Sequence, residues 1–122
     1  MRIVIADDSD ILRSRMVEIL SEVEGIQIVA EAKDTKQAIE TVKTKHPDIV
    51  IIDIRMPGDD GIFAVETIKK NKKNGPKIIV FTNYPYLQYR KKCMDAGADY
   101  FFYKALEFEK LIVLIKDLAL KR

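Results

Sequence analysis

A strict alternation of short apolar runs with helical patterns is the feature that most limits how this chain can fold. Five runs rich in β-branched or aromatic residues predict buried strands at Ile3–Ala6, Ile26–Ala30, Ile49–Ile52, Ile78–Phe81 and Tyr100–Tyr103. A segment with helical spacing follows each run, and such a segment suits a right-handed crossover between parallel strands. The alternation therefore predicts an α/β fold: one doubly wound, five-stranded parallel sheet with five helices on its two faces.

Start and stop signals bound the predicted helices. We expect them from Ile11 to Val23, from Asp34 to the residue before Pro47, from Gly61 into the polar run Lys69–Gly75, from Tyr86 to Ala96, and from Glu107 to Leu120. On the first helix, the residues expected to face the sheet are Ile11, Leu12, Met16, Ile19, Leu20 and Val23. Asp34 and Gln37 resemble a capping box, and Gln27 suggests that the second strand lies at an edge.

Size and composition exclude several classes of protein. The 122 residues suffice for one domain, expected over residues 1–122. A net charge of +2 is too balanced to predict direct nucleic-acid binding, and no apolar run is long enough to span a membrane. The start does not read as a signal peptide, and a single cysteine fits a reducing compartment, so we expect a cytoplasmic protein.

Polar side chains stand directly after four of the predicted strands. Asp7 and Asp8 follow the first strand, Asp53 the third, Thr82 the fourth and Lys104 the fifth. Each one alone can be explained as a helix cap, a loop residue or a surface lysine. Because the carboxyl ends of parallel strands meet at one sheet edge, we expect the five to converge there.

The predicted cluster has the chemistry of a phosphoryl-transfer site. Neighbouring carboxylates repel one another by about 1 to 4 kcal/mol per pair, so Asp7, Asp8 and Asp53 require a cation or protons. A few carboxylates with water-filled positions suit Mg²⁺, which also accepts phosphate oxygens. Thr82 and Lys104 add a hydrogen-bond donor and a positive charge for a phosphoryl group. The residue types suit phosphoryl transfer to a carboxylate.

This pattern resembles the receiver domains of bacterial two-component response regulators over the whole chain. The features that carry the resemblance are Asp7-Asp8, Asp53 with Met56-Pro57 and Gly61, Thr82, and Lys104. The resemblance implies the strand order 2-1-3-4-5, which is the flavodoxin-like order. It also implies that Asp53 receives a phosphoryl group from a histidine kinase or a phosphotransfer protein.

The resemblance further implies a role for each site residue. Asp8, Asp53 and the backbone carbonyl of Arg55 would hold Mg²⁺, and Asp7 would act on the ion through water. Thr82 and Lys104 would hold the phosphoryl oxygens. Phe101 would occupy the position of the aromatic switch residue.

Two positions depart from the commonest receiver pattern. Ala105 stands after the lysine where proline is usual, so the isomer of the Lys104–Ala105 peptide is left open. Asn83 is larger than the usual residue after the threonine and could narrow access to the site. The run from Thr82 to Pro85 resembles receivers of the NarL/FixJ type. Many of those are joined to a helix-turn-helix domain, and the chain is expected to be a receiver without one.

Two other function classes share parts of this pattern. A flavodoxin-like cofactor-binding domain would need a Ser/Thr/Gly-rich phosphate loop after the first strand, where this chain has acids. A phosphatase with an aspartate nucleophile usually has a second acid two residues later, where this chain has Arg55. A receiver that catalyses only its own phosphorylation and dephosphorylation is therefore favoured over an enzyme acting on metabolites.

The last predicted helix is apolar nearly all round. We expect Leu111, Leu114, Ile115 and Leu118 to cover the sheet and Phe108, Ile112 and Ala119 to be exposed. Such a helix is often buried on a second side. The fourth helix, fifth strand and fifth helix are therefore expected to form a face that binds a downstream protein or a second copy of the chain.

The lifetime of an aspartyl phosphate depends on whether water reaches it. Arg55 and Tyr84 follow Asp53 and Thr82 by two residues, and both side chains are large enough to restrict that access. Asn83 is the third residue expected to control access. The sequence therefore predicts a long-lived phosphorylated state.

Overall fold

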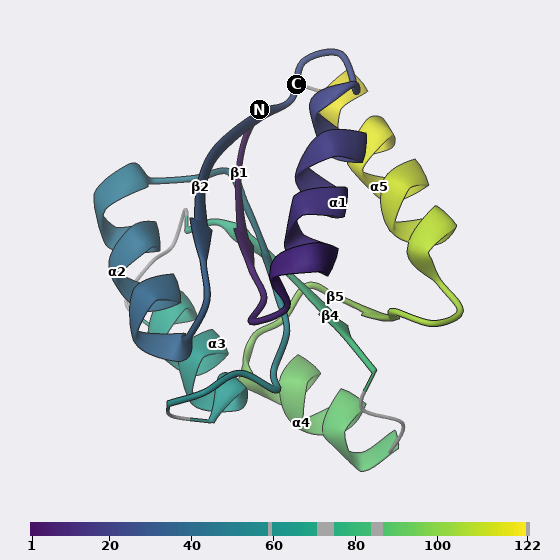
Figure 1. Cartoon of the computed structure of the whole chain (residues 1–122). Coiled ribbons are helices and arrows are strands. Elements are labelled where there is room, and N and C mark those ends of the chain that lie inside the picture. The colour runs from purple at the N-terminus through teal and green to yellow at the C-terminus, as the bar shows by residue number, and fades with distance from the viewer. Residues whose placement is uncertain (59, 71–74, 84–86, 122) are drawn as a thin grey trace.

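The computed structural model describes residues 1–58, 60–70, 75–83 and 87–121, and it contains one parallel sheet (Figure 1). The strands are β1 (Arg2–Ala6), β2 (Gln27–Ala32), β3 (Ile49–Ile52), β4 (Lys77–Thr82) and β5 (Tyr100–Tyr103). Their order is β2-β1-β3-β4-β5, and every neighbouring pair is parallel. The predicted fold class, the strand order and the edge position of the second strand are thus confirmed.

The described residues form five helices, which pack on the two faces of the sheet (Figure 1). They are α1 (Asp10–Ser21), α2 (Thr35–Lys45), α3 (Gly61–Lys69), α4 (Leu87–Ala96) and α5 (Phe108–Leu120). One buried cluster joins α1 and α5 to one face of the sheet, and the other joins α2, α3 and α4 to the opposite face. In β1, β3, β4 and β5, alternate residues enter the two clusters, because successive side chains of a strand point to opposite faces.

The edge strand β2 differs from its predicted bounds. It begins at Gln27 and continues to Ala32, two residues beyond the apolar run. Glu31 and Ala32 pair with Ile5 and Ala6 of β1, so pairing with a neighbour extends the strand through a charged residue. This extension brings Glu31 to the end of the sheet where the acid pair lies.

The capping box at the start of α2 forms in a modified arrangement. The Asp34 carboxylate accepts a hydrogen bond of 2.8 Å from the Gln37 N–H, as predicted. The Gln37 side chain returns a bond of 2.9 Å to the N–H of Lys33, one residue before the cap.

One predicted inward residue of α1 is wrong. Ile11 is 81% exposed, whereas Arg13, Met16 and Leu20 form the buried stripe. Residues of a helix are separated by about 100° of rotation, so Ile11 lies on the side opposite Arg13. The exposure of Ile11 was not predicted, because only apolar residues were expected to face the sheet.

The exposed side of α5 is also different from the prediction. Phe108 and Ile112 are partly buried against the α1–α5 cluster, and Ala119 is intermediate in exposure. Val113 is 66% exposed instead, because it lies about 200° around the helix from the buried Leu111.

Gly61, the first residue of α3, packs against the loop that follows β3. A Cβ atom at this position would lie 2.3 Å from the Ile54 Cα. This clash can be relieved only if the backbone moves. We expect Gly61→Ala to lower the free energy of unfolding by about 3 kcal/mol in urea denaturation. Gly25→Ala is the matched control, since Gly25 has a φ of +85° with no atom within 4 Å of the added Cβ. It should cost about 1 kcal/mol from backbone strain alone. Equal losses for the two variants would contradict the steric explanation.

Within the described part of the chain, no helix is both long and apolar enough to cross a bilayer.

Candidate functional site

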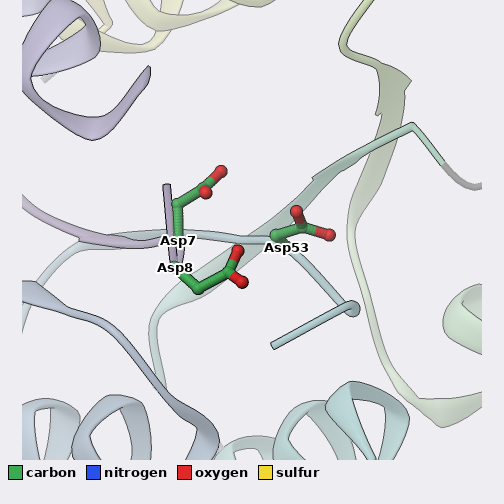
Figure 2. Close-up of side chains that lie close together, drawn as sticks. All are labelled: Asp7, Asp8 and Asp53. Atoms are coloured by element: carbon green, nitrogen blue, oxygen red, sulfur yellow. The ribbon is translucent and has the colours of Figure 1, made fainter. Parts of the chain in front are cut away.

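Three carboxylates lie together where β1 and β3 end side by side (Figure 2). Ala6 pairs with Ile52, so Asp7 and Asp53 leave neighbouring strands at the same level, and the Asp53 N–H bonds the Ala6 carbonyl at 3.0 Å. Oxygen atoms of Asp7, Asp8 and Asp53 lie within 4.8 Å of one another. Asp7 and Asp53 are buried, whereas Asp8 is exposed and open to solvent.

Lys104 is the cation that bridges this group. Its Nζ lies 2.5 Å from an Asp7 oxygen and 2.6 Å from the Asp53 Oδ2. Burial alone would lower the pKa of Lys104, but the hydrogen bonds and charges of Asp53 and Asp7 outweigh it and raise this pKa. The ammonium is therefore charged at neutral pH.

The carboxylate of Asp53 is held by three donors. Thr82 is buried at the end of β4, and its hydroxyl donates to the Asp53 Oδ1 at 2.7 Å. The Arg55 N–H donates to the same oxygen at 2.9 Å, while Lys104 holds the other oxygen. The Lys104 N–H in turn bonds the Thr82 carbonyl at 2.9 Å. Asp53 therefore has a fixed orientation with its oxygens toward a threonine hydroxyl and a lysine.

The donor set fits a divalent cation. The formal charges of three carboxylates and one ammonium leave two surplus negative charges at the site. Carboxylate oxygens are the ligands that Mg²⁺ prefers, and the exposure of Asp8 leaves room for water on one side. The acidic cluster could thus hold a metal ion.

The two departures from the receiver pattern contact each other. Asn83 is exposed, and its Oδ1 accepts a hydrogen bond of 3.0 Å from the N–H of Ala105. The Lys104–Ala105 peptide is trans. Proline could not make this contact, because it has no N–H. The pair joins the segment after Thr82 to the segment after Lys104.

The remaining predicted residues are placed as follows. Phe101 is buried on β5, with the Tyr103 ring 5.2 Å away edge-on and the Arg90 guanidinium 5.7 Å from its centroid. Arg55 is exposed beside Asp53. Tyr84 lies outside the described residues.

Arg13 is the residue of this region that the sequence analysis missed. It is buried on α1 and donates to the backbone carbonyl of Asp7 at 2.7 Å. An arginine at the inward position one turn before Met16 was the signal that could have identified it.

Comparison with known proteins agrees with the resemblance seen in the sequence. A family profile described as the response regulator receiver domain matches residues 3–116. The transcriptional regulatory protein PdtaR of Mycobacterium tuberculosis is 37% identical over 99% of this chain. The match covers 57% of PdtaR, so the chain spans little more than half of that relative's length.

Solved structures show the same fold. The receiver domain of the response regulator NarL from Mycobacterium tuberculosis superposes with a TM-score of 0.88 at 26% identity, covering 99% of this chain and 97% of that one. A chain of the CheX–CheY–BeF3–Mg²⁺ complex from Borrelia burgdorferi gives a TM-score of 0.85 at 29% identity over 97% of this chain and 88% of that one. Neither a flavodoxin-like cofactor binder nor an aspartate-based phosphatase gains support. The chain belongs to the receiver-domain family of response regulators, whose members are phosphoacceptor switches of two-component signalling.

Proposed function

We propose that Asp53 is the phosphoacceptor of this receiver and that residues 1–122 form one receiver domain that catalyses its own phosphorylation and dephosphorylation. The observation that carries the proposal is the Asp53 carboxylate, whose two oxygens are bonded by the Thr82 hydroxyl and the Lys104 ammonium beside two further acids. The related CheY complex, which contains BeF3 and Mg²⁺, adds support.

Each side chain has a part in the transfer. An Asp53 oxygen forms the new bond to phosphorus as the phosphorus bond to the donor breaks. The Thr82 hydroxyl and the Lys104 ammonium then have phosphoryl oxygens as partners in place of the carboxylate. Asp8, Asp53 and the Arg55 carbonyl would bind Mg²⁺, with Asp7 beside them, and the ion would neutralise charge on the transferred group.

The donor and the output belong to the same proposal. A histidine kinase or a phosphotransfer protein would supply the phosphoryl group, in the cytoplasm. Phe101 would respond to phosphorylation, since its buried ring lies on β5 with the Arg90 guanidinium of α4 over it. PdtaR is a transcriptional regulatory protein, but balanced charge argues against direct nucleic-acid binding by this domain.

Phosphorylation by a small donor tests the assignment. The protein should gain one phosphoryl group when acetyl phosphate and Mg²⁺ are present, as read by intact mass. Excess EDTA should abolish the gain, because the acids would then repel the incoming anion. No mass gain in Mg²⁺, or an equal gain in EDTA, would contradict the proposed site.

The face formed by α4, β5 and α5 is proposed to bind a downstream protein or a second copy. We assign to this face two exposed apolar side chains, Leu106 before α5 and Val113 on α5. If a second copy binds, phosphorylated wild type should sediment as a dimer, and Val113→Lys should remain monomeric. Phe63→Lys, at a half-exposed apolar residue of α3, is the matched control and should still dimerise. A monomer in all samples, with unchanged partner binding in Val113→Lys, would contradict the role of this face.

Arg55 is proposed to prolong the phosphorylated state. Its exposed side chain follows Asp53 closely enough to pair with phosphoryl oxygens and exclude water. Phosphate loss should accelerate severalfold in Arg55→Ala, while Arg15→Ala on α1 should match wild type in the same assay.

The corresponding prediction for Tyr84 rests on sequence alone. The rate of phosphate loss should also be measured in Asn83→Ala, because the Asn83 side chain accepts a hydrogen bond from the Ala105 N–H. Unchanged decay in all these variants would show that other residues control water access.

A further inference from the structure

Arg13 is a buried cation that contacts the backbone of Asp7, the first residue of the Asp7-Asp8 pair. Only 7% of the residue is exposed, and its guanidinium makes three charge-assisted hydrogen bonds. Nη1 donates to the Asp7 carbonyl at 2.7 Å, Nε to Glu31 at 2.9 Å and Nη2 to Asp10 at 2.6 Å. A guanidinium is planar, so these three bonds together fix its position and its plane.

The backbone at Asp7 is held on both sides. Its N–H donates to the Ala32 carbonyl of β2 at 2.9 Å, and its carbonyl accepts from Arg13. That carbonyl belongs to the planar peptide unit that leads into Asp8. The bond from Arg13 therefore sets the direction in which the chain enters Asp8. The Asp7 side chain is held separately, since its Oδ1 accepts from the Ser9 N–H at 2.9 Å.

Glu31 anchors Arg13 to the sheet. It lies on the edge strand β2, where it pairs with Ile5 of β1, and its carboxylate is 44% exposed. Asp10, the third partner, is 72% exposed on the first turn of α1. Glu31 thus joins Arg13 to the rigid sheet, whereas Asp10 belongs to the same helix as Arg13.

We propose that Arg13, anchored by Glu31, is a positioning residue that orients Asp8 to bind the divalent cation. The inference rests on the proposed function, because it assumes that the acid cluster binds Mg²⁺. Residues that orient metal ligands typically contribute 10- to 100-fold to metal affinity. Arg13 acts through the backbone of Asp7 and does not touch the ion.

An electrostatic effect of Arg13 and a positioning role of Arg13 predict opposite changes in Mg²⁺ affinity when the residue is replaced. A positive group near the cluster repels a cation, so charge alone would make Arg13→Gln bind Mg²⁺ more tightly. Loss of the bond to the Asp7 carbonyl would instead release Asp8 and weaken binding. Arg13→Lys keeps the positive charge, but an ammonium cannot reproduce the three hydrogen bonds of the planar guanidinium. Charge alone therefore predicts no change in Mg²⁺ affinity for Arg13→Lys.

Calorimetric titration with Mg²⁺ decides between these explanations. We expect the dissociation constant to rise about tenfold in Arg13→Gln, and severalfold in Arg13→Lys and Glu31→Gln. Arg15→Gln, at an exposed arginine of the same helix, should match wild type. Melting curves in EDTA will identify any variant that has lost its fold, and Arg13→Lys then carries the test in place of Arg13→Gln.

The outcomes separate this inference from the proposed function. Mg²⁺ binding by Arg13→Lys equal to that of wild type, or tighter binding by Arg13→Gln, would overturn the positioning role while leaving the site assignment intact. A wild-type protein that binds no Mg²⁺ would overturn the proposed function itself, and the inference with it.

Discussion

Asp53→Asn should take up no phosphoryl group from acetyl phosphate in Mg²⁺, whereas wild type takes up one. Asparagine keeps the size of the side chain and can still accept the bond from Thr82, so the buried environment should persist. The amide oxygen carries no negative charge and is a poor nucleophile toward phosphorus. The loss should therefore be complete, with little change in fold.

Asp60→Asn is the matched control for this prediction. Asp60 is an exposed carboxylate in the same loop, and it caps α3 by accepting from the Ile62 N–H at 2.9 Å. Asparagine caps helices about as well as aspartate, so this variant should keep both its stability and its phosphorylation. Equal mass gain in Asp53→Asn and wild type would place the modified residue elsewhere. Borohydride reduction followed by peptide mapping would then locate the acyl phosphate.

The fold could be predicted because its signals are local and repeated. The predicted bounds of Ile49–Ile52 and Tyr100–Tyr103 match β3 and β5. The errors fall where tertiary contacts override composition. β2 continues through Glu31 because β1 pairs with it, and Ile11 is exposed because the inward position of α1 belongs to Arg13.

The convergence of the site could also be predicted, because strand ends of a parallel sheet meet at one edge. Sequence could not show the contacts through which residues such as Arg13 support the site. Arg13 on α1 and Glu31 on β2 are 18 residues apart in the sequence, and their contact depends on how α1 packs against β2. The bond between Asn83 and Ala105 has the same origin, since it joins residues that only the fold brings together. Such contacts leave no periodic signal.

Removing Lys104 should also produce a large loss of stability. The ammonium is the partner of two buried carboxylates, and its own side chain is only 10% exposed. In EDTA at pH 7, we expect Lys104→Met to unfold with a free energy about 3 kcal/mol below that of wild type. The cause is the uncompensated charge of Asp7 and Asp53. Lys91→Met removes an exposed pair with Asp95 and should cost at most about 0.5 kcal/mol.

The stability that Lys104 contributes should depend on pH. The folded-state pKa of Lys104 is raised above its ordinary value of 10.5, so folding favours the charged form. The stabilisation is therefore fully present below the unfolded-state pKa and is lost as pH rises through the folded-state pKa. The difference between wild type and Lys104→Met should be constant near neutral pH and shrink in strongly alkaline solution.

Binding of Mg²⁺ should also reduce the difference in stability between wild type and Lys104→Met. Without Lys104, the acid cluster has one more surplus negative charge, so Mg²⁺ should bind Lys104→Met more tightly and raise its melting temperature more than that of wild type. Urea denaturation with and without Mg²⁺ measures both effects. Equal stability of Lys104→Met and wild type in EDTA would show that Asp7 and Asp53 do not need this counterion. The site would then have to neutralise its acids by taking up protons, which would show as a stability maximum at lower pH.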